Sequence, residues 1–277
     1  MKDNRPSDTA MGASVIRAVH QLIDDHPLIL DDPVSPRLLP AETLEAITAD
    51  PGRHREPRAK GLRSHVVLRS RYAEDELREA VKGGVERFVN VGAGFDTFAF
   101  RKPAWAAKLS VVEVDHPASQ RAKIEHFSAR DLRPSGNTSF VSLDLEKGDL
   151  PAALGASGVD LDLPAFFACL GVLAYLTSGA IARMLKGISA IPGTRGLVLA
   201  FAPRLPGREE SPAAERAARA GEPWLSRFTA EEIAGLLESC GFRSVQFLSP
   251  QAAAERYFKG RSDLPAPRLA RLCVARP

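Results

Sequence analysis

Two glycines follow an apolar run in the stretch RFVNVGAGFDTFAF, residues 87–100, which places Gly92 and Gly94 at the end of a predicted strand. Glycine at a strand end lets the backbone turn sharply and approach a ligand closely, and a following helix points its N-terminal amides at that ligand. On these residues alone, a nucleotide-binding loop and a plain tight turn both remain open.

Acidic residues end the next two apolar runs, SVVEVD and VSLD. A carboxylate at Asp115 suits the two hydroxyls of a ribose. Asp144 is placed to accept from an adenine amine while Leu145 packs on the ring face; alternatively, Asp144 only caps a helix that starts near Glu146. Thr97 stands where the dinucleotide fingerprint has its third glycine, so the pattern favours an adenosyl ligand without a pyrophosphate over NAD.

Short apolar runs alternate with helical stretches from residue 86 onward, which predicts a doubly wound α/β fold with a mostly parallel, seven-stranded sheet. In such a sheet, ligands bind beyond the carboxyl ends of the strands, where the glycines and acids are predicted to lie. The expected strands are residues 87–92, 109–115, 138–144, 164–170, 196–202, 244–249 and 269–275, and the clearest helices are 117–129, 177–190 and 229–241.

Residues 1–84 are expected to form a helical cap or lid, and residues 85–277 the cofactor-binding core. Residues 8–30 carry apolar side chains at helical spacing and end in a turn-prone segment, and a longer helix is predicted at 58–84 with Gly83 and Gly84 as its stop signal. Thr229 and Glu232 form a capping-box pattern at the start of a helix that ends at Gly241. The polar segment 204–223 is expected to be a loop with a short helix, or a flap over the site.

Composition excludes several classes of function. Lys+Arg is 37 against Asp+Glu 34, spread along the chain, so nucleic acid is not an expected partner. The 3 cysteines lie far apart in apolar stretches, which argues against disulfides and a zinc site. No apolar segment is long enough to span a membrane, and the first residues lack a signal-peptide pattern. We expect a soluble, cytoplasmic protein with no bound metal; the sequence indicates no oligomeric state.

The chain resembles the S-adenosylmethionine-dependent methyltransferases related to leucine carboxyl methyltransferase, in particular the bacterial branch. The resemblance runs almost end to end, and the combination of GAGFDT with EVDHP is its most specific part. It implies a class I, Rossmann-like methyltransferase core, S-adenosylmethionine as cofactor, and an O-methyltransferase that acts on a carboxylate or hydroxyl of a small molecule or peptide-derived metabolite.

The resemblance also implies roles for particular residues. Arg69 matches the arginine that binds the methionine carboxylate, with Arg71 as its neighbour on the same predicted helix. Gly92 and Gly94 match the loop under the methionine portion. Asp115 matches the ribose acid, with Glu113 as a second candidate, and the adenine-side pair corresponds to Asp144 and Leu145.

Three positions depart from the family pattern. Leu170 stands where relatives commonly have a glutamate, so a carboxylate on the cofactor side is missing and the cofactor's ammonium needs another acceptor. Phe98 and Phe100 replace an arginine and a tyrosine of bacterial relatives, which makes the start of the first core helix more apolar. We expect the specificity of this protein to begin there.

An ionised carboxylate acceptor needs no general base, whereas a hydroxyl acceptor does, and the candidate bases are His20 and His65. The side chains considered for the acceptor pocket are Arg17, Tyr72, Tyr175 and Arg204, and an arginine among them would pair with an acidic acceptor. Competing hypotheses are a non-methylating cyclisation or isomerisation in a biosynthetic pathway, a binding module without catalysis, and an NAD-dependent oxidoreductase.

Overall fold

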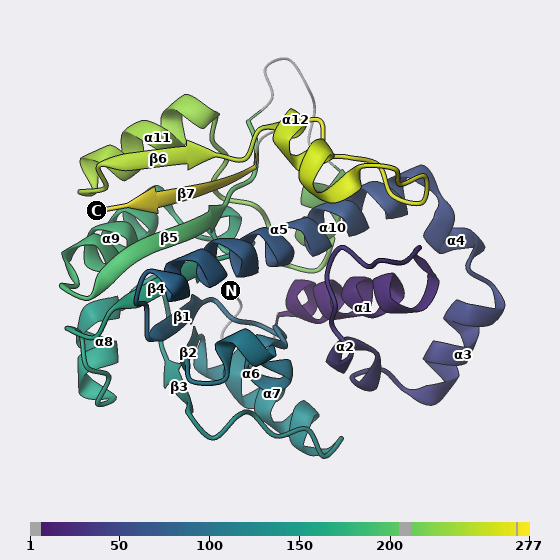
Figure 1. The fold of residues 1–277 in the computed structure, drawn as a ribbon, viewed down its shortest axis with the longest axis horizontal. Coiled ribbons are helices and arrows are strands. Elements are labelled where there is room, and N and C mark those ends of the chain that lie inside the picture. The colour runs from purple at the N-terminus through teal and green to yellow at the C-terminus, as the bar shows by residue number, and fades with distance from the viewer. Residues whose placement is uncertain (1–6, 205–211, 270) are drawn as a thin grey trace.

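A seven-stranded sheet forms the centre of the protein (Figure 1). The computed structural model describes residues 7–204, 212–269 and 271–277. The strands are β1 (Arg87–Val91), β2 (Ser110–Asp115), β3 (Thr138–Ser142), β4 (Ala165–Cys169), β5 (Thr194–Ala200), β6 (Ser244–Phe247) and β7 (Leu272–Arg276). Their order is β3-β2-β1-β4-β5-β7-β6, with β1 to β5 paired in parallel and β7 antiparallel to both of its neighbours. The predicted mostly parallel, doubly wound sheet is confirmed.

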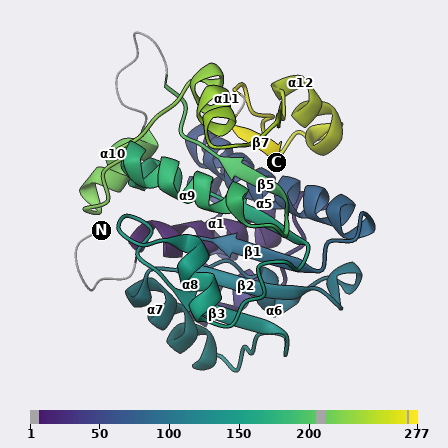
Figure 2. The same ribbon diagram turned by 90° about the vertical axis from the view of Figure 1, so that its left-hand side faces the viewer.

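Helices cover both faces of the sheet. One apolar cluster includes residues of α8 (Leu150–Ala156), α9 (Ser178–Ala190) and α11 (Ala230–Ser239), and a second includes residues of α5 (Pro57–Lys82), α6 (Phe98–Arg101) and α12 (Pro250–Ala253). In Figure 2, α9 and α5 lie on opposite sides of β5. Because side chains alternate along a strand, β1 contributes Val89 and Val91 to the first cluster and Phe88 to the second.

Further helices and short turns complete the described chain. The helix predicted within residues 8–30 is observed as α1 (Asp8–Ile23), which ends before the turn-prone segment, whereas the sequence did not indicate the three short helices that follow. The remaining elements are α1 (Asp8–Ile23), α2 (Val34–Arg37), α3 (Ala41–Ala49), α4 (Gly52–Arg55), α7 (Pro117–Ser128), α10 (Pro212–Arg219), the 3-10 turns η1 (Ala104–Ala106) and η2 (Leu173–Tyr175), and the π-helical turn η3 (Ala254–Phe258).

The predicted helix boundaries in α5 and α11 are confirmed. The last residue of α5 precedes Gly83, and Gly84 has φ of 91°. At the start of α11, the Thr229 hydroxyl accepts from the amide of Glu232, whose carboxylate accepts from the Thr229 amide in return. Gly241, with φ of 100°, ends this helix in the left-handed conformation that glycine adopts without strain.

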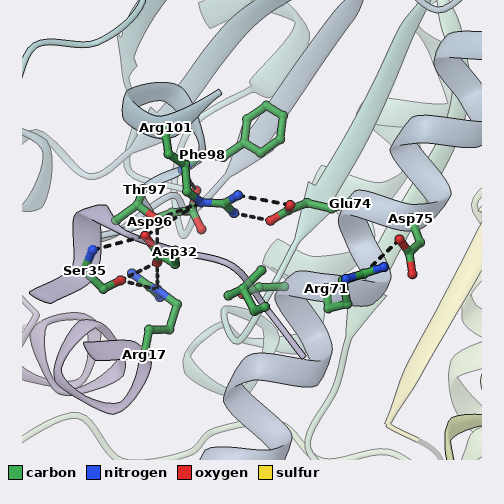
Figure 3. Close-up of polar contacts among 12 residues, drawn as sticks. Arg17, Asp32, Ser35, Arg71, Glu74, Asp75, Asp96, Thr97, Phe98 and Arg101 are labelled. Carbon is green, nitrogen blue, oxygen red and sulfur yellow. Dashed lines mark hydrogen bonds and ion pairs between the residues drawn. The ribbon is translucent and has the colours of Figure 1, made fainter. Parts of the chain in front are cut away.

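A buried cluster of charges fastens the N-terminal helices to the loop after β1 (Figure 3). At its centre, the Asp32 carboxylate accepts from Arg17 Nε at 3.1 Å and from Thr97 Oγ1 at 2.7 Å. Arg101 lies 3.8 Å from Asp32 and pairs with Glu74 of α5. Burial disfavours the Asp32 carboxylate, but the charges of Arg17 and Arg101 outweigh it and lower its pKa. Thr97 therefore holds the cluster in place through its hydroxyl, which a glycine could not do.

The N-terminal helices also share apolar contacts with the core. Leu77 of α5 lies in the same cluster as Phe88 and Phe166 of the sheet. In Figure 1, α5 runs across the strands while α1 lies beside its first half. The division of the chain at residue 84 stays a prediction.

Two further observations concern the described residues. The structure contains, within those ranges, no helix that is both long and apolar enough to cross a bilayer. The thiols of Cys169, Cys240 and Cys273 are free and buried.

Candidate functional site

A cavity of about 1580 Å³ lies at the carboxyl edge of the parallel strands. Small-ligand pockets commonly measure roughly 300–1,000 Å³, so this one has room for a cofactor together with a second ligand. Residues far apart in the sequence meet here because parallel strands end at the same edge. All six predicted cofactor-site residues line it: Arg69, Gly92, Gly94, Asp115, Asp144 and Leu145.

The glycine loop is shaped by two close approaches. Gly92 has φ of 71°, and a Cβ at this position would lie 2.2 Å from Cγ2 of Val172, which follows β4. Gly94 has φ of 48°, and its Cβ would lie 3.0 Å from Cβ of Ala10 in α1. Both positions thus require glycine for conformation and for space, and α1 lies directly against the loop.

The two predicted acids reach the cavity from adjacent strand ends. Asp115 accepts hydrogen bonds from the amides of Gly94 and His116; burial nevertheless raises its pKa above the ordinary value. Asp144 accepts from the Glu146 amide at 3.0 Å. The alternative reading of Asp144 as the cap of a helix near Glu146 is wrong, because α8 begins at Leu150 and Asp149 caps it.

Glu113, the second candidate for the ribose acid, lies elsewhere. Its side chain is buried between β2 and α7, where Oε2 accepts from Lys123 Nζ at 2.5 Å. Burial raises the Glu113 pKa to about 7, although the charge of Lys123 opposes the shift. Because Glu113 does not line the cavity, Asp115 is the acid from β2 that a ligand can reach.

The structure separates the two neighbouring arginines of α5. Arg71 pairs with Asp75 at 3.0 Å and donates to the Ile29 carbonyl, outside the cavity. Arg69 lines the cavity, and its Nη1 would lie 2.4 Å from a Cβ at Gly171, the residue after Leu170. Across the described ranges, no carboxylate forms an ion pair with Arg69, and burial lowers its pKa to about 10. A guanidinium in this state is suited to a ligand carboxylate.

Leu170 itself lines the cavity. It also packs against the second apolar cluster, the one that includes residues of α5, α6 and α12 and is called here the apolar cluster under α5. Asp96 in the glycine loop, to which the sequence analysis gave no role, is another carboxylate in the cavity wall. One oxygen of Asp96 accepts from the Phe98 amide at 2.8 Å, and its charge acts on Arg69 from within the same cavity. Its place within GAGFDT was the available signal.

The donor set fits the group that the resemblance implies. The Arg69 guanidinium, which has no ion pair within the described residues, and the nearby Asp96 carboxylate match the charged ends of an amino acid. Asp115 and Asp144 supply acceptors at two successive strand ends, and Leu145 supplies an apolar surface beside them. These residues can together hold an adenosyl amino acid.

The two candidate bases differ in location. His20 is buried outside the cavity: its Nδ1 bonds to Asp24 at 2.8 Å while its Nε2 accepts from the Leu30 amide, so the ring is committed to structure. His65 lines the cavity. Burial, and then the charges of Arg69 and Arg271, lower its pKa to about 3. At neutral pH the His65 imidazole is uncharged and a weak proton acceptor.

This depressed pKa predicts how stability depends on pH. Below pH 6.5, the ordinary histidine pKa, His65 is protonated in the unfolded chain but stays neutral in the folded protein. The free energy of unfolding therefore falls as pH falls. Between pH 7 and pH 5 we expect wild type to lose about 1–2 kcal/mol more than His65→Asn. Urea unfolding of both proteins at the two pH values measures the difference, and equal losses would contradict it.

Most other residues considered for acceptor binding lie elsewhere or are already engaged. Phe98 and Phe100 do not line the cavity: Phe98 packs on Phe88, and Phe100 on Phe127, with ring centroids 5.0 and 4.3 Å apart. The expectation that specificity begins at these two residues is therefore wrong. Tyr72 is buried in the apolar cluster under α5.

The arginines proposed to pair with the acceptor are also committed. Arg204 is exposed outside the cavity and pairs with Glu232. Arg17 lines the cavity, but its guanidinium already donates hydrogen bonds to Asp32 and to the Phe95 carbonyl. Tyr175 does line the cavity. Of the expected flap, residues 205–211 lie outside the described ranges, while Ala217 and Ala220 belong to the cavity wall.

Comparisons of sequence identify relatives of this chain. A family model described as leucine carboxyl methyltransferase matches residues 10–189. A Bacillus subtilis (strain 168) protein named "Putative S-adenosyl-L-methionine-dependent methyltransferase YktD" is 31% identical over 290 residues, which cover 95% of each chain. A Mycobacterium avium (strain 104) protein named "Putative S-adenosyl-L-methionine-dependent methyltransferase" is 30% identical over 196 residues, 66% of this chain and 62% of its own length.

Solved structures share the architecture. A "putative methyltransferase" from Thermobifida fusca YX superposes with a TM-score of 0.56 at 19% identity, covering 99% of this chain and 96% of that one. A DUF574 family protein from Streptomyces avermitilis gives 0.55 at 18% identity, with 95% and 96% covered. At these identities the likeness concerns the fold alone, and it confirms the predicted Rossmann-like, methyltransferase-type sheet.

Proposed function

The chain belongs to the leucine carboxyl methyltransferase family and is an S-adenosylmethionine-dependent methyltransferase, and we propose that it methylates a carboxylate oxygen of a small or peptide-like acceptor. The observation that carries this choice is the state of His65. His65 and His116 both line the cavity. His116 uses its Nδ1 to accept from the Ala118 amide at the start of α7, and burial lowers the pKa of His65 to about 3, so His65 is a weak base at neutral pH. A carboxylate is ionised at that pH and needs no base, whereas a hydroxyl must lose a proton.

In this proposal each end of the cofactor has its own residues. Arg69 binds the methionine carboxylate, Asp96 takes the ammonium in place of the carboxylate missing at Leu170, and Asp115 accepts from the ribose hydroxyls. The adenine lies between Asp144 and Leu145. Support comes from the convergence of these side chains on one cavity and from the absence of an ion pair on Arg69 within the described residues.

The protein's contribution to the reaction is position and exclusion of water. The bound cofactor supplies a methyl group already activated on a sulfonium. The chain holds the acceptor in line with that methyl and limits water in the site through α1 and Trp224, which line the cavity. Such alignment supplies most of the rate in a displacement that transfers no proton.

Isothermal titration with S-adenosylhomocysteine tests the cofactor half of the proposal. Arg69→Gln is expected to weaken binding by about 2 kcal/mol, roughly thirtyfold, because a buried charge-assisted pair is lost. The matched control is Arg71→Gln, two residues along the same helix, whose partner Asp75 lies outside the cavity. A control that lost as much affinity as Arg69→Gln would contradict the assignment of Arg69, and no heat with folded wild type would refute the cofactor site.

Product analysis tests the acceptor half. A metabolite pool incubated with the protein and a methyl-labelled donor should give a product heavier by one methyl group. Mild alkali should release the label as methanol, since esters hydrolyse and ethers do not. An alkali-stable label would identify a hydroxyl acceptor, and an unchanged substrate mass would favour the non-methylating reaction that Leu170 raised as an alternative.

A further inference from the structure

Arg271 is a second half-buried arginine that lines the cavity and has no ion pair among the described residues, whereas Arg55, Arg58 and Arg268 of the same wall are exposed. Arg271 directly precedes β7, whose antiparallel direction places its first residues at the carboxyl edge of the parallel strands. The Arg271 carbonyl accepts from the Phe201 amide at 3.0 Å, which fixes the backbone beside the end of β5. Among the described parts of the chain, no carboxylate pairs with its guanidinium, and burial lowers its pKa.

The α5 helix relates Arg271 to the cofactor end. Arg58, Leu62, His65 and Arg69 lie on one helical face, and all line the cavity. With a rise of about 1.5 Å per residue, His65 lies about 6 Å from Arg69 along the axis, and Arg58 about 16 Å. The charges of both Arg69 and Arg271 act on His65. Arg271 therefore lies in the same part of the cavity as His65.

The cavity wall carries charges of both signs. Asp96, Asp115 and Asp144 line it, and so do Arg58, Lys60, Arg268 and Arg271. Two further acids of the wall already have partners in the protein. Asp263 pairs with Arg261 at 2.6 Å and accepts from the Asp25 amide, and Glu222 accepts from Thr9 and Ser7.

We infer that Arg271 binds an anionic group of the methyl acceptor, distinct from the oxygen that receives the methyl group. A partly buried guanidinium that has no counterion among the described residues can be satisfied by an anion from a ligand. That anion should not be the reacting carboxylate, because methylation removes its charge and would leave Arg271 unpaired in the product complex. The inference rests on the proposed function only for placing the acceptor in this cavity.

The test uses linear dicarboxylates from succinate to sebacate as monomethyl and dimethyl esters, titrated into protein loaded with S-adenosylhomocysteine. A monomethyl ester keeps one anion and mimics the methylated product, whereas its dimethyl ester is neutral. At least one monomethyl ester should bind wild type about tenfold more tightly than its dimethyl ester. In Arg271→Gln this preference should fall below about twofold, and Arg271→Lys should keep part of it.

Controls separate this inference from the proposed function. Arg204→Gln, which removes an exposed arginine outside the cavity, should keep the full preference. Arg271→Gln should bind S-adenosylhomocysteine as wild type does and unfold at the same temperature. The inference is overturned if every monomethyl ester binds no better than its dimethyl ester, or if Arg271→Gln retains the preference. Failure of wild type to bind S-adenosylhomocysteine would instead overturn the proposed function. The inference on Arg271 could still be tested in that case, because the esters can also be titrated into unloaded protein.

Discussion

Replacing Asp32 by asparagine is expected to lower the free energy of unfolding by about 3–5 kcal/mol. The Asp32 side chain is fully buried, and it bonds to Arg17, Thr97 and Ser35 while Arg101 lies 3.8 Å away. Asparagine keeps the shape but removes the charge, so the buried guanidinium of Arg17 loses its counterion. Urea unfolding monitored by circular dichroism measures the loss.

Two variants sharpen this test. Asp149→Asn makes the same chemical change at an exposed helix cap, and we expect a change under about 0.5 kcal/mol because asparagine caps as well as aspartate. Removing the charge at both ends of the pair, in Arg17→Met with Asp32→Asn, should recover part of the loss. A loss below about 1 kcal/mol in Asp32→Asn would show that the cluster does not hold the N-terminal helices to the glycine loop.

Gly92→Ala is expected to destabilise the protein by about 2–4 kcal/mol and to weaken S-adenosylhomocysteine binding at least about tenfold. The φ of 71° is strained for alanine, and the new Cβ would lie 2.2 Å from Cγ2 of Val172. Relief of this overlap must move either the glycine loop or the segment after β4, both of which line the cavity. Unfolding and titration on the same variant measure the two effects.

A second substitution separates strain from overlap. Val172→Ala removes the Cγ atoms and should restore about half of the stability lost in Gly92→Ala, leaving the cost of positive φ. Gly155→Ala in α8 is the control, since nothing lies within 4 Å of its new Cβ, and it should be neutral or stabilising by up to about 1 kcal/mol. No recovery in the double variant would show that Val172 does not limit position 92.

The strands and the helices between them could be predicted from the sequence because their signals are local. Apolar runs ending in glycine or acid predicted β1, β2 and β3 within a few residues, and the capping box predicted the start of α11. Helices α2 to α4 were not predicted, because four to nine residues carry too little periodicity to distinguish a helix from a loop.

The site was predictable to the extent that it follows from strand ends. Gly92, Gly94, Asp115 and Asp144 were placed correctly in one cavity because parallel strands end at a common edge. Asp96 was given no role although it lies in the same motif, because the sequence does not show whether its carboxylate only accepts from a nearby amide, as from Phe98, or also lines the cavity.

The sequence by itself determined the class of fold, the family and the strand ends that could bind a cofactor, because backbone conformation and alternation of side chains are set by near neighbours. Only the tertiary structure decided which charges are available to a ligand. Arg17 and Arg71 are paired with acids, whereas Arg69 and Arg271 face the cavity without an ion pair among the described residues. The pairing of Arg17 and Arg101 with Asp32 joins residues distant in the chain, and no local pattern records it, whereas Arg71 and Asp75 are four residues apart on one helix.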